Sequence, residues 1–156
     1  MSTRIAELRD SGILLQLAYQ AMLELDLDIQ LIFSRCGVNA ELLHDRNART
    51  PHDAQNLFWQ VLEEVSGDAH IGLHIAEKMP VYKGQVLQYL FLSSPTFGEG
   101  LKRALSYQRL LSDATLATFE MMDAEASIRI SSSSEKVKDL RHLSEAVAVG
   151  LIKICE

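Results

Sequence analysis

The sequence has 156 residues and a mass of 17.4 kDa, with 47% hydrophobic and 23% charged side chains, which is typical of one globular domain. Its 8 glycines and 3 prolines are few for this length, which favours long helices and excludes a β-sandwich, a collagen-like repeat and a Pro/Gly-rich disordered tail. The net charge is −6, and neither half of the chain carries the basic excess that binding to nucleic-acid phosphates requires.

Cysteine usage and hydropathy indicate a cytoplasmic chain. Cys36 and Cys155 lie far apart and form no CxxC motif, so both are predicted to be reduced thiols. The first residues contain an acidic side chain and no apolar core, unlike a signal peptide. Apolar runs are far shorter than the roughly 20 residues of a membrane-spanning helix, so no contact with a membrane is predicted.

The first third of the chain is predicted to be helical. Leucine and alanine recur every three or four positions over 13–25. A second helix is expected over 29–36, because Asp28 can cap its start and Gly37 suits the left-handed turn that ends a helix. Asn39 can cap a further short helical turn.

The clearest helix start in the sequence lies at 50–53. Thr50 can cap this helix, Pro51 fits its first position, and Asp53 places an acid in its first turn. The apolar stripe that follows ends at Gly67. Capping residues, prolines and apolar spacing predict three more helices, over 68–79, 85–92 and 97–111.

Apolar periodicity changes from helical to alternating after residue 115. Residues 115–122 and 127–131 alternate around a polar turn, which predicts a β-hairpin, and a last helix is expected from Asp139 onward. The fold class is therefore α+β and predominantly helical, with about six to seven helices and one β-hairpin near residues 115–131. The last helix has no cap, and a lone hairpin is marginally stable, so residues 1–156 are predicted to be one domain that is incomplete at its C-terminus.

Two local patterns have both a functional and a structural interpretation. Residues 32–43 resemble a helix-turn-helix, but acidic flanks favour an ordinary helical corner. His70 and His74 have the spacing of metal ligands, with Glu77 as a third, but they fall on the polar face of an amphipathic helix. No hydrolase or phosphate-loop motif is complete, so we expect no enzyme activity, no bound metal and no cofactor.

Four polar side chains within apolar segments are candidate contacts for a small molecule. Tyr82, Tyr89, Tyr107 and Arg109 combine apolar surface with hydrogen-bonding groups, as pocket linings do. The alternative is that the tyrosines pack through their rings with the hydroxyls at the surface. This assignment comes from side-chain chemistry and not from any family motif.

Several segments resemble a known family when taken in order. They are Val38–Leu43 with Asp45–Pro51, Ser66–Leu73, the Ser-Ser-Pro-Thr of 93–96, and Tyr-x-Arg-Leu-Leu-Ser-Asp at 107–113. From about Leu17 onward the chain is similar to the N-terminal regulatory (arabinose-binding-like) domain of AraC/XylS-type bacterial transcription regulators. The resemblance implies a domain that binds an unidentified small-molecule effector, forms a homodimer, or does both. It also implies that DNA is bound through a separate C-terminal helix-turn-helix domain, which this sequence lacks.

Two further functions remain open on the residues alone. One is a helical protein-interaction domain without a small-molecule ligand, which presents an apolar face to a partner or to a second copy. The other is a metal-dependent hydrolase built on His70 and His74, which requires a stoichiometric metal ion.

Overall fold

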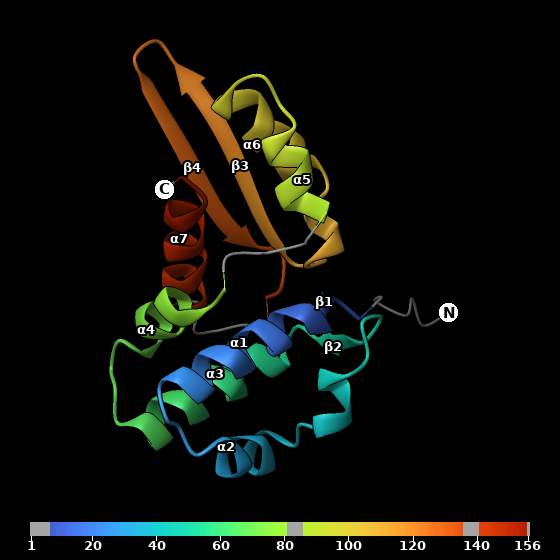
Figure 1. Ribbon diagram of the computed structural model, residues 1–156, viewed down its shortest axis with the longest axis vertical. Coiled ribbons are helices and arrows are strands. Elements are labelled where there is room, and N and C mark those ends of the chain that lie inside the picture. The colour runs from blue at the N-terminus through green and yellow to red at the C-terminus, as the bar shows by residue number, and fades with distance from the viewer. Residues whose placement is uncertain (1–6, 81–85, 136–140, 156) are drawn as a thin grey trace.

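The computed structural model describes residues 7–80, 86–135 and 141–155, and its order of elements confirms a predominantly helical α+β fold. Seven α-helices and two small antiparallel sheets lie within these residues (Figure 1). The elements are β1 (Arg9–Ser11), α1 (Gly12–Glu24), α2 (Ile29–Cys36), the 3₁₀ turn η1 (Ala40–Leu43), β2 (Arg49–Pro51), α3 (Ala54–Ser66), α4 (Ile71–Lys78), α5 (Val86–Leu92), α6 (Phe97–Ser106), the 3₁₀ turn η2 (Gln108–Leu110), β3 (Thr115–Met122), β4 (Glu125–Ser132) and α7 (Arg141–Cys155).

Most of the predicted helix boundaries are confirmed by the caps that form them. Asp28, Asn39 and Thr96 each accept a first-turn backbone N–H with a side-chain oxygen. Gly37 and Gly67 end their helices with φ angles of 65° and 67°, which are left-handed conformations that glycine adopts without strain. Local sequence chemistry therefore sets these ends.

The predicted helix start at Thr50 is wrong, because Thr50 and Pro51 belong to strand β2 instead. β2 pairs with β1 in a small sheet that the sequence pattern did not reveal, since three residues are too few to show an alternation. Helix α3 begins at Ala54, and Asp53 makes no side-chain cap hydrogen bond.

Two other boundaries also differ from prediction. His70, not Asp68, is the N-cap of α4, although the Asp68 carboxylate still accepts the backbone N–H of His70 at 2.8 Å. The helix predicted to continue to Leu111 ends at Ser106, and the chain continues as η2.

Helices α1 to α4 enclose the main hydrophobic core in the lower part of the molecule (Figure 1). Its members come from all four helices and are almost completely removed from solvent. They are Ala18, Ala21, Met22, Ile32, Phe33, Trp59, Val61, Leu62, Ile71 and Ile75. Burial of this apolar surface is the main favourable contribution to folding of this part.

The predicted hairpin is confirmed and forms the upper part of the molecule with α5 and α6. The register pairs Ala117 with Ile130 and Phe119 with Ile128, so one face of the hairpin is apolar. Helix α6 contacts β3, and Gly98 of α6 lies against the Phe119 ring. The opposite face carries polar side chains, as expected for a sheet covered on one side.

Helix α7 packs closely against α4 at Gly72. A Cβ atom at this position would lie 2.6 Å from the backbone oxygen of His142, which is closer than real contacts permit. The absence of a side chain at Gly72 therefore allows the two helices to approach each other.

We expect Gly72→Ala to lower the free energy of unfolding by about 1–3 kcal/mol, because α7 must shift to avoid the added methyl group. Alanine is the better helix former, so helix propensity alone would predict the opposite sign. Urea denaturation measures the change. Gly98→Ala in α6 is the control, because its Cβ would meet the flexible Met121 sulfur at 3.3 Å. Equal stability of Gly72→Ala and the unsubstituted protein would contradict this account of the α4–α7 contact.

Candidate ligand-binding site

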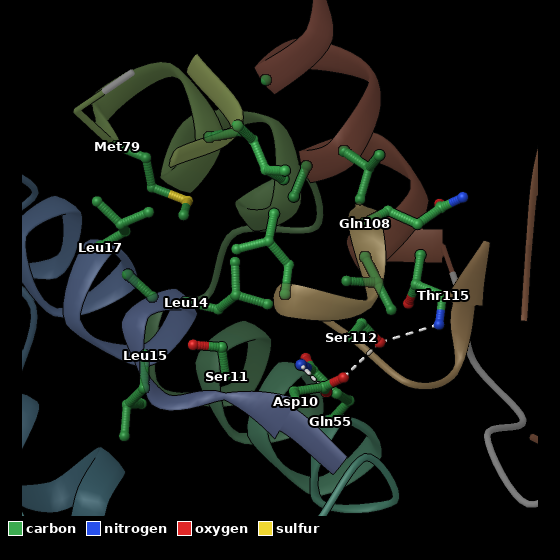
Figure 2. A pocket seen from close by; sticks show the side chains of 18 of the residues that line it. Asp10, Ser11, Leu14, Leu15, Leu17, Gln55, Met79, Gln108, Ser112 and Thr115 are labelled. Carbon is green, nitrogen blue, oxygen red and sulfur yellow. Dashed lines mark hydrogen bonds between the residues drawn. The ribbon is translucent and has the colours of Figure 1, made fainter. Parts of the chain in front are cut away.

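A cavity of about 260 Å³ lies where the α1–α4 part, α7 and the α5–α6–hairpin part meet (Figure 2). This volume is many times the about 30 Å³ that one water molecule occupies in the liquid, so the cavity is more than a packing defect. Most of its lining is apolar. The apolar lining includes Leu14, Leu15, Leu17 and Ala18 of α1, Phe58 and Trp59 of α3, Met79, Leu87 and Phe91, Leu101, Ala104 and Leu105 of α6, and Leu143, Ala146, Val147, Leu151 and Ile154 of α7.

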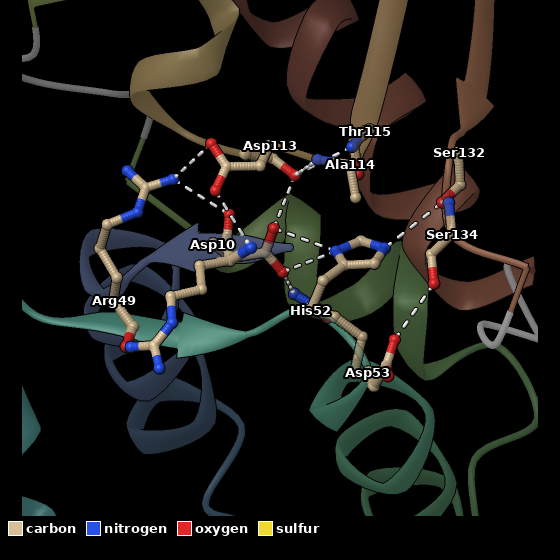
Figure 3. Close-up of polar contacts among 12 residues, drawn as sticks. Asp10, Arg49, His52, Asp53, Asp113, Ala114, Thr115, Ser132 and Ser134 are labelled. Carbon is tan, nitrogen blue, oxygen red and sulfur yellow. Dashed lines mark hydrogen bonds and ion pairs between the residues drawn. The ribbon is translucent and has the colours of Figure 1, made fainter. Parts of the chain in front are cut away.

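The polar part of the lining is built around Asp10 of β1, which is 1% exposed (Figure 3). His52 is completely buried, and its Nδ1 lies 3.0 and 2.9 Å from the two carboxylate oxygens of Asp10. Because a carboxylate can only accept, Nδ1 carries the proton in this contact. The Ser112 hydroxyl donates to Asp10 at 2.6 Å, and Gln55 Nε2 donates at 2.9 Å.

This buried cluster connects segments that are distant in the sequence. The backbone N–H of Ser11 donates to Leu111 at 2.7 Å, and a bridge joins Asp10 to Ser112. Ser112 Oγ in turn accepts the backbone N–H groups of Ala114 and Thr115. The Ser112 side chain that donates to the Asp10 carboxylate therefore also orients the start of β3.

Opposing effects act on the ionisation of Asp10. Burial is the largest single effect and favours the protonated acid. The hydrogen bonds from His52, Ser112 and Gln55, together with the charge of His52, outweigh burial and hold the pKa of Asp10 below its usual value. The ionised carboxylate is therefore the form that the folded protein stabilises.

Polar contacts nearer the surface lie on two sides of this cluster. Arg49 of β2 forms an ion pair with Asp113 at 3.1 Å, and the backbone N–H of Arg9 donates to the same carboxylate at 3.1 Å. On the other side, the Ser134 hydroxyl donates to Asp53 at 3.1 Å. These contacts join the start of the hairpin to the β1–β2 sheet and its end to the residue before α3.

Two more polar side chains in the lining are occupied by protein groups. The side chain of Gln108 accepts the Ala117 N–H at 2.6 Å and donates to the Ala117 carbonyl at 3.0 Å. Lys153 of α7 donates to the carbonyl oxygens of Ala76, Glu77 and Met79 at 3.3, 2.7 and 2.6 Å. Lys153 thus places a positive charge at the C-terminal end of α4, where the helix dipole favours it.

Three of the four predicted contact residues lie in described parts of the chain and are not in the lining of this cavity. Tyr89 of α5 is 64% exposed, Tyr107 at the end of α6 is 53% exposed, and Arg109 is exposed in η2. These three do not line the cavity, and Tyr82 lies outside the described residues. Their role in effector binding stays a prediction.

Two polar residues of the cavity lining are sequence neighbours of predicted contact residues. Gln88 precedes Tyr89 and Gln108 follows Tyr107, and both line the cavity. Adjacent residues on a helix point in different directions, so neighbours in sequence can face the cavity and the solvent respectively. The helical spacing of apolar residues in α6 places Ala104 and Leu105 on its inner face, but this pattern does not distinguish a cavity wall from core packing.

The other predicted features are placed as follows. His74 contacts Asp68, and His70 Nδ1 lies 3.2 Å from an Arg141 nitrogen. Among the residues that the structure describes, no three potential ligands are grouped to hold a metal ion. The residues resembling a helix-turn-helix form α2 and the four-residue turn η1. Cys36 has a free thiol, and the side chain of Cys155 lies outside the description.

The sequence comparison gives the family. Residues 27–156 match the arabinose-binding domain found at the N-terminus of AraC transcription regulators, which is most of the chain. The chain therefore belongs to this family of regulatory, ligand-binding domains. A comparison with curated proteins gives no match. None of the helices in the described residues is long and apolar enough to cross a lipid bilayer.

We expect the stability of this protein to fall as the pH drops through the lowered pKa of Asp10. An unfolded aspartate titrates near pH 3.9, so the stabilisation is present above that value and is lost below it. Asp10→Asn is expected to lose about 2–3 kcal/mol at pH 7 and to show a flatter dependence between pH 5 and 2.5. Urea denaturation across this range measures both effects.

The matched control is Asp123→Asn in the exposed hairpin turn, which should follow the unsubstituted protein at every pH. Ser112→Ala provides a second variant, because it retains the Asp10 carboxylate and removes one of its hydrogen bonds. Identical pH slopes for Asp10→Asn and the unsubstituted protein would show that Asp10 does not couple folding to pH.

Proposed function

We propose that this chain is the effector-sensing domain of a DNA-binding transcription regulator, and that it acts by binding and not by catalysis. The observation that carries the proposal is the position of the cavity, whose lining comes from the α1–α4 part, α7 and the α5–α6–hairpin part. A small molecule in this space touches each of them. The family supports a regulator as the context.

The position of the cavity suggests how binding becomes a signal. A ligand shifts a conformational equilibrium only if it binds one arrangement better than another. A ligand that bridges α1, α6 and α7 favours arrangements in which these helices are close together. We infer that DNA binding by the intact regulator, through a separate domain, responds to this difference.

Screening a metabolite library for compounds that raise the melting temperature of the protein tests the proposal. The screen includes arabinose, because the family is described by that sugar. Ala104→Phe fills the cavity from α6 and should abolish the shift, whereas Ser106→Phe on the exposed side of the same helix should retain it. A compound whose effect survives in Ala104→Phe would bind elsewhere.

The same screen tests the residues predicted from sequence. If Tyr89, Tyr107 and Arg109 contact the effector, alanine at these positions weakens binding at least as much as Ala104→Phe does. Retention of binding in all three variants would reject their assignment. Intact binding in Ala104→Phe together with loss in the tyrosine variants would place the effector outside the cavity.

A second candidate function is self-association, and the exposed face of α5 favours it. Val86, Tyr89 and Leu92 lie three residues apart on one side of the helix and are 60, 64 and 66% exposed. Apolar side chains grouped in this way are typical of contact surfaces between protein chains. We propose that this face contacts a second copy of the chain.

We expect Tyr89→Glu to lower the association constant at least tenfold, because it places a charge within that apolar face. Sedimentation velocity over a range of protein concentrations measures association. Leu57→Glu on α3 is the matched control, since Leu57 is also a partly exposed apolar residue, at 45%. A monomer at all concentrations, or equal losses in both variants, would reject the α5 face as a dimer contact.

A further inference from the structure

We propose that the cavity takes a neutral ligand that is mostly hydrocarbon, and not a sugar or an ionised molecule. This inference rests on the proposed function, because it specifies the ligand of the same cavity.

The walls provide the first argument. Leu14 and Leu17 of α1, Phe91 of α5, and Leu101 of α6 meet the cavity from different sides. Hydroxyl groups of a sugar placed against such side chains would lose their hydrogen bonds to water without replacement. Hydrocarbon surface in the same position is favoured, because it leaves water.

The thiol of Cys36 adds to the apolar character of the cavity wall. It lines the cavity, and burial raises its pKa, although the nearby charge of Arg35 acts in the opposite direction. The thiol is therefore protonated at neutral pH and behaves as a small apolar group.

The polar side chains of the lining provide the second argument, because most of them already have partners in the protein. Both carboxylate oxygens of Asp10 accept hydrogen bonds, and the amide of Gln55 donates to Asp10 while accepting from Trp59. Gln108 is held by the backbone of one residue of β3. Gln88 likewise already has an interaction partner within the protein. A ligand with many hydroxyl groups therefore finds few groups to bind.

Hydroxyl groups are what the lining offers to a ligand. Ser11, Thr50 and Thr115 each contribute one, and Ser11 and Thr115 both lie beside the Asp10–Ser112 cluster (Figure 2). The Ser11 oxygen accepts the Ile13 N–H at the start of α1, so this hydroxyl can still donate its own proton to a ligand. Their number suits one or two polar atoms, such as those of an alcohol, a ketone or an amide. The polar atom of the ligand is thus expected at this end.

Charge provides the third argument. Within the described lining, the ionised side chains are Asp10 and Lys153. Asp10 faces His52, and Lys153 directs its ammonium group to three carbonyl oxygens at the end of α4. A cationic ligand would compete with His52, and an anionic one would draw Lys153 away from α4. A neutral ligand disturbs neither contact.

Binding of 1-octanol, octanoate, octylamine and arabinose to the full chain tests the inference. These probes separate hydrocarbon, negative charge, positive charge and hydroxyl number. Each is titrated against the fluorescence of bound N-phenyl-1-naphthylamine, and melting temperatures are recorded in parallel. We expect octanol to displace the dye at a concentration at least tenfold lower than octanoate or octylamine, and arabinose to have no effect.

Two variants locate the bound probe. Ala104→Phe should weaken octanol binding at least tenfold, while Ser106→Phe should leave it unchanged. Thr115→Val should weaken octanol severalfold and leave dye binding intact, because only octanol carries a hydroxyl group. Unchanged octanol binding in Ala104→Phe would overturn the placement in the cavity.

The outcomes separate this inference from the proposed function. Binding of arabinose, octanoate or octylamine in preference to octanol, blocked by Ala104→Phe, would overturn the neutral hydrocarbon ligand and leave the sensing cavity supported. Binding of neither octanol nor the dye would overturn this inference. No binding of any probe or library compound would overturn the sensing cavity as well.

Discussion

The buried contact between Asp10 and His52 is the interaction on which the arrangement of this domain depends. Burial of two ionisable groups is unfavourable unless each has a partner, and here they partner each other. Ser112 and Gln55 satisfy the remaining acceptor sites of the carboxylate. Asp10 lies in β1, His52 lies between β2 and α3, Gln55 lies in the first turn of α3, and Ser112 precedes β3. Their pairing therefore fixes how the helical part and the hairpin part are joined.

The cavity follows from this junction. β1 and β3 are brought together at the Asp10 cluster, while α1 and α6 diverge from it with leucine side chains between them. The apolar side chains between α1 and α6 do not fill the space between these helices, and the cavity remains. The same polar cluster that orders the junction thus leaves an apolar cavity beside it, and this combination is what a ligand-responsive domain needs.

Local features of the chain could be predicted from sequence, whereas contacts between distant segments could not. The hairpin is predictable because apolar residues alternate over 115–122 and 127–131. Helix ends at Asp28, Gly37 and Thr96 are predictable because caps act locally. The pair of Asp10 and His52 is separated by 42 positions and follows no repeating pattern. Cavity-lining and core residues are both apolar, so Ala104 and Leu105 gave no sign of which role they have.

The contacts of α7 have a mechanical consequence. Near its start α7 touches α4 at Gly72, and eleven residues after His142 its Lys153 binds the carbonyl groups at the other end of α4. With a rise of about 1.5 Å per residue, these two attachments are separated by about 16 Å along the helix. Two attachments so far apart resist tilting of one helix relative to the other. These two attachments therefore hold α4 and α7 in one relative orientation, so the two helices form a single wall of the cavity.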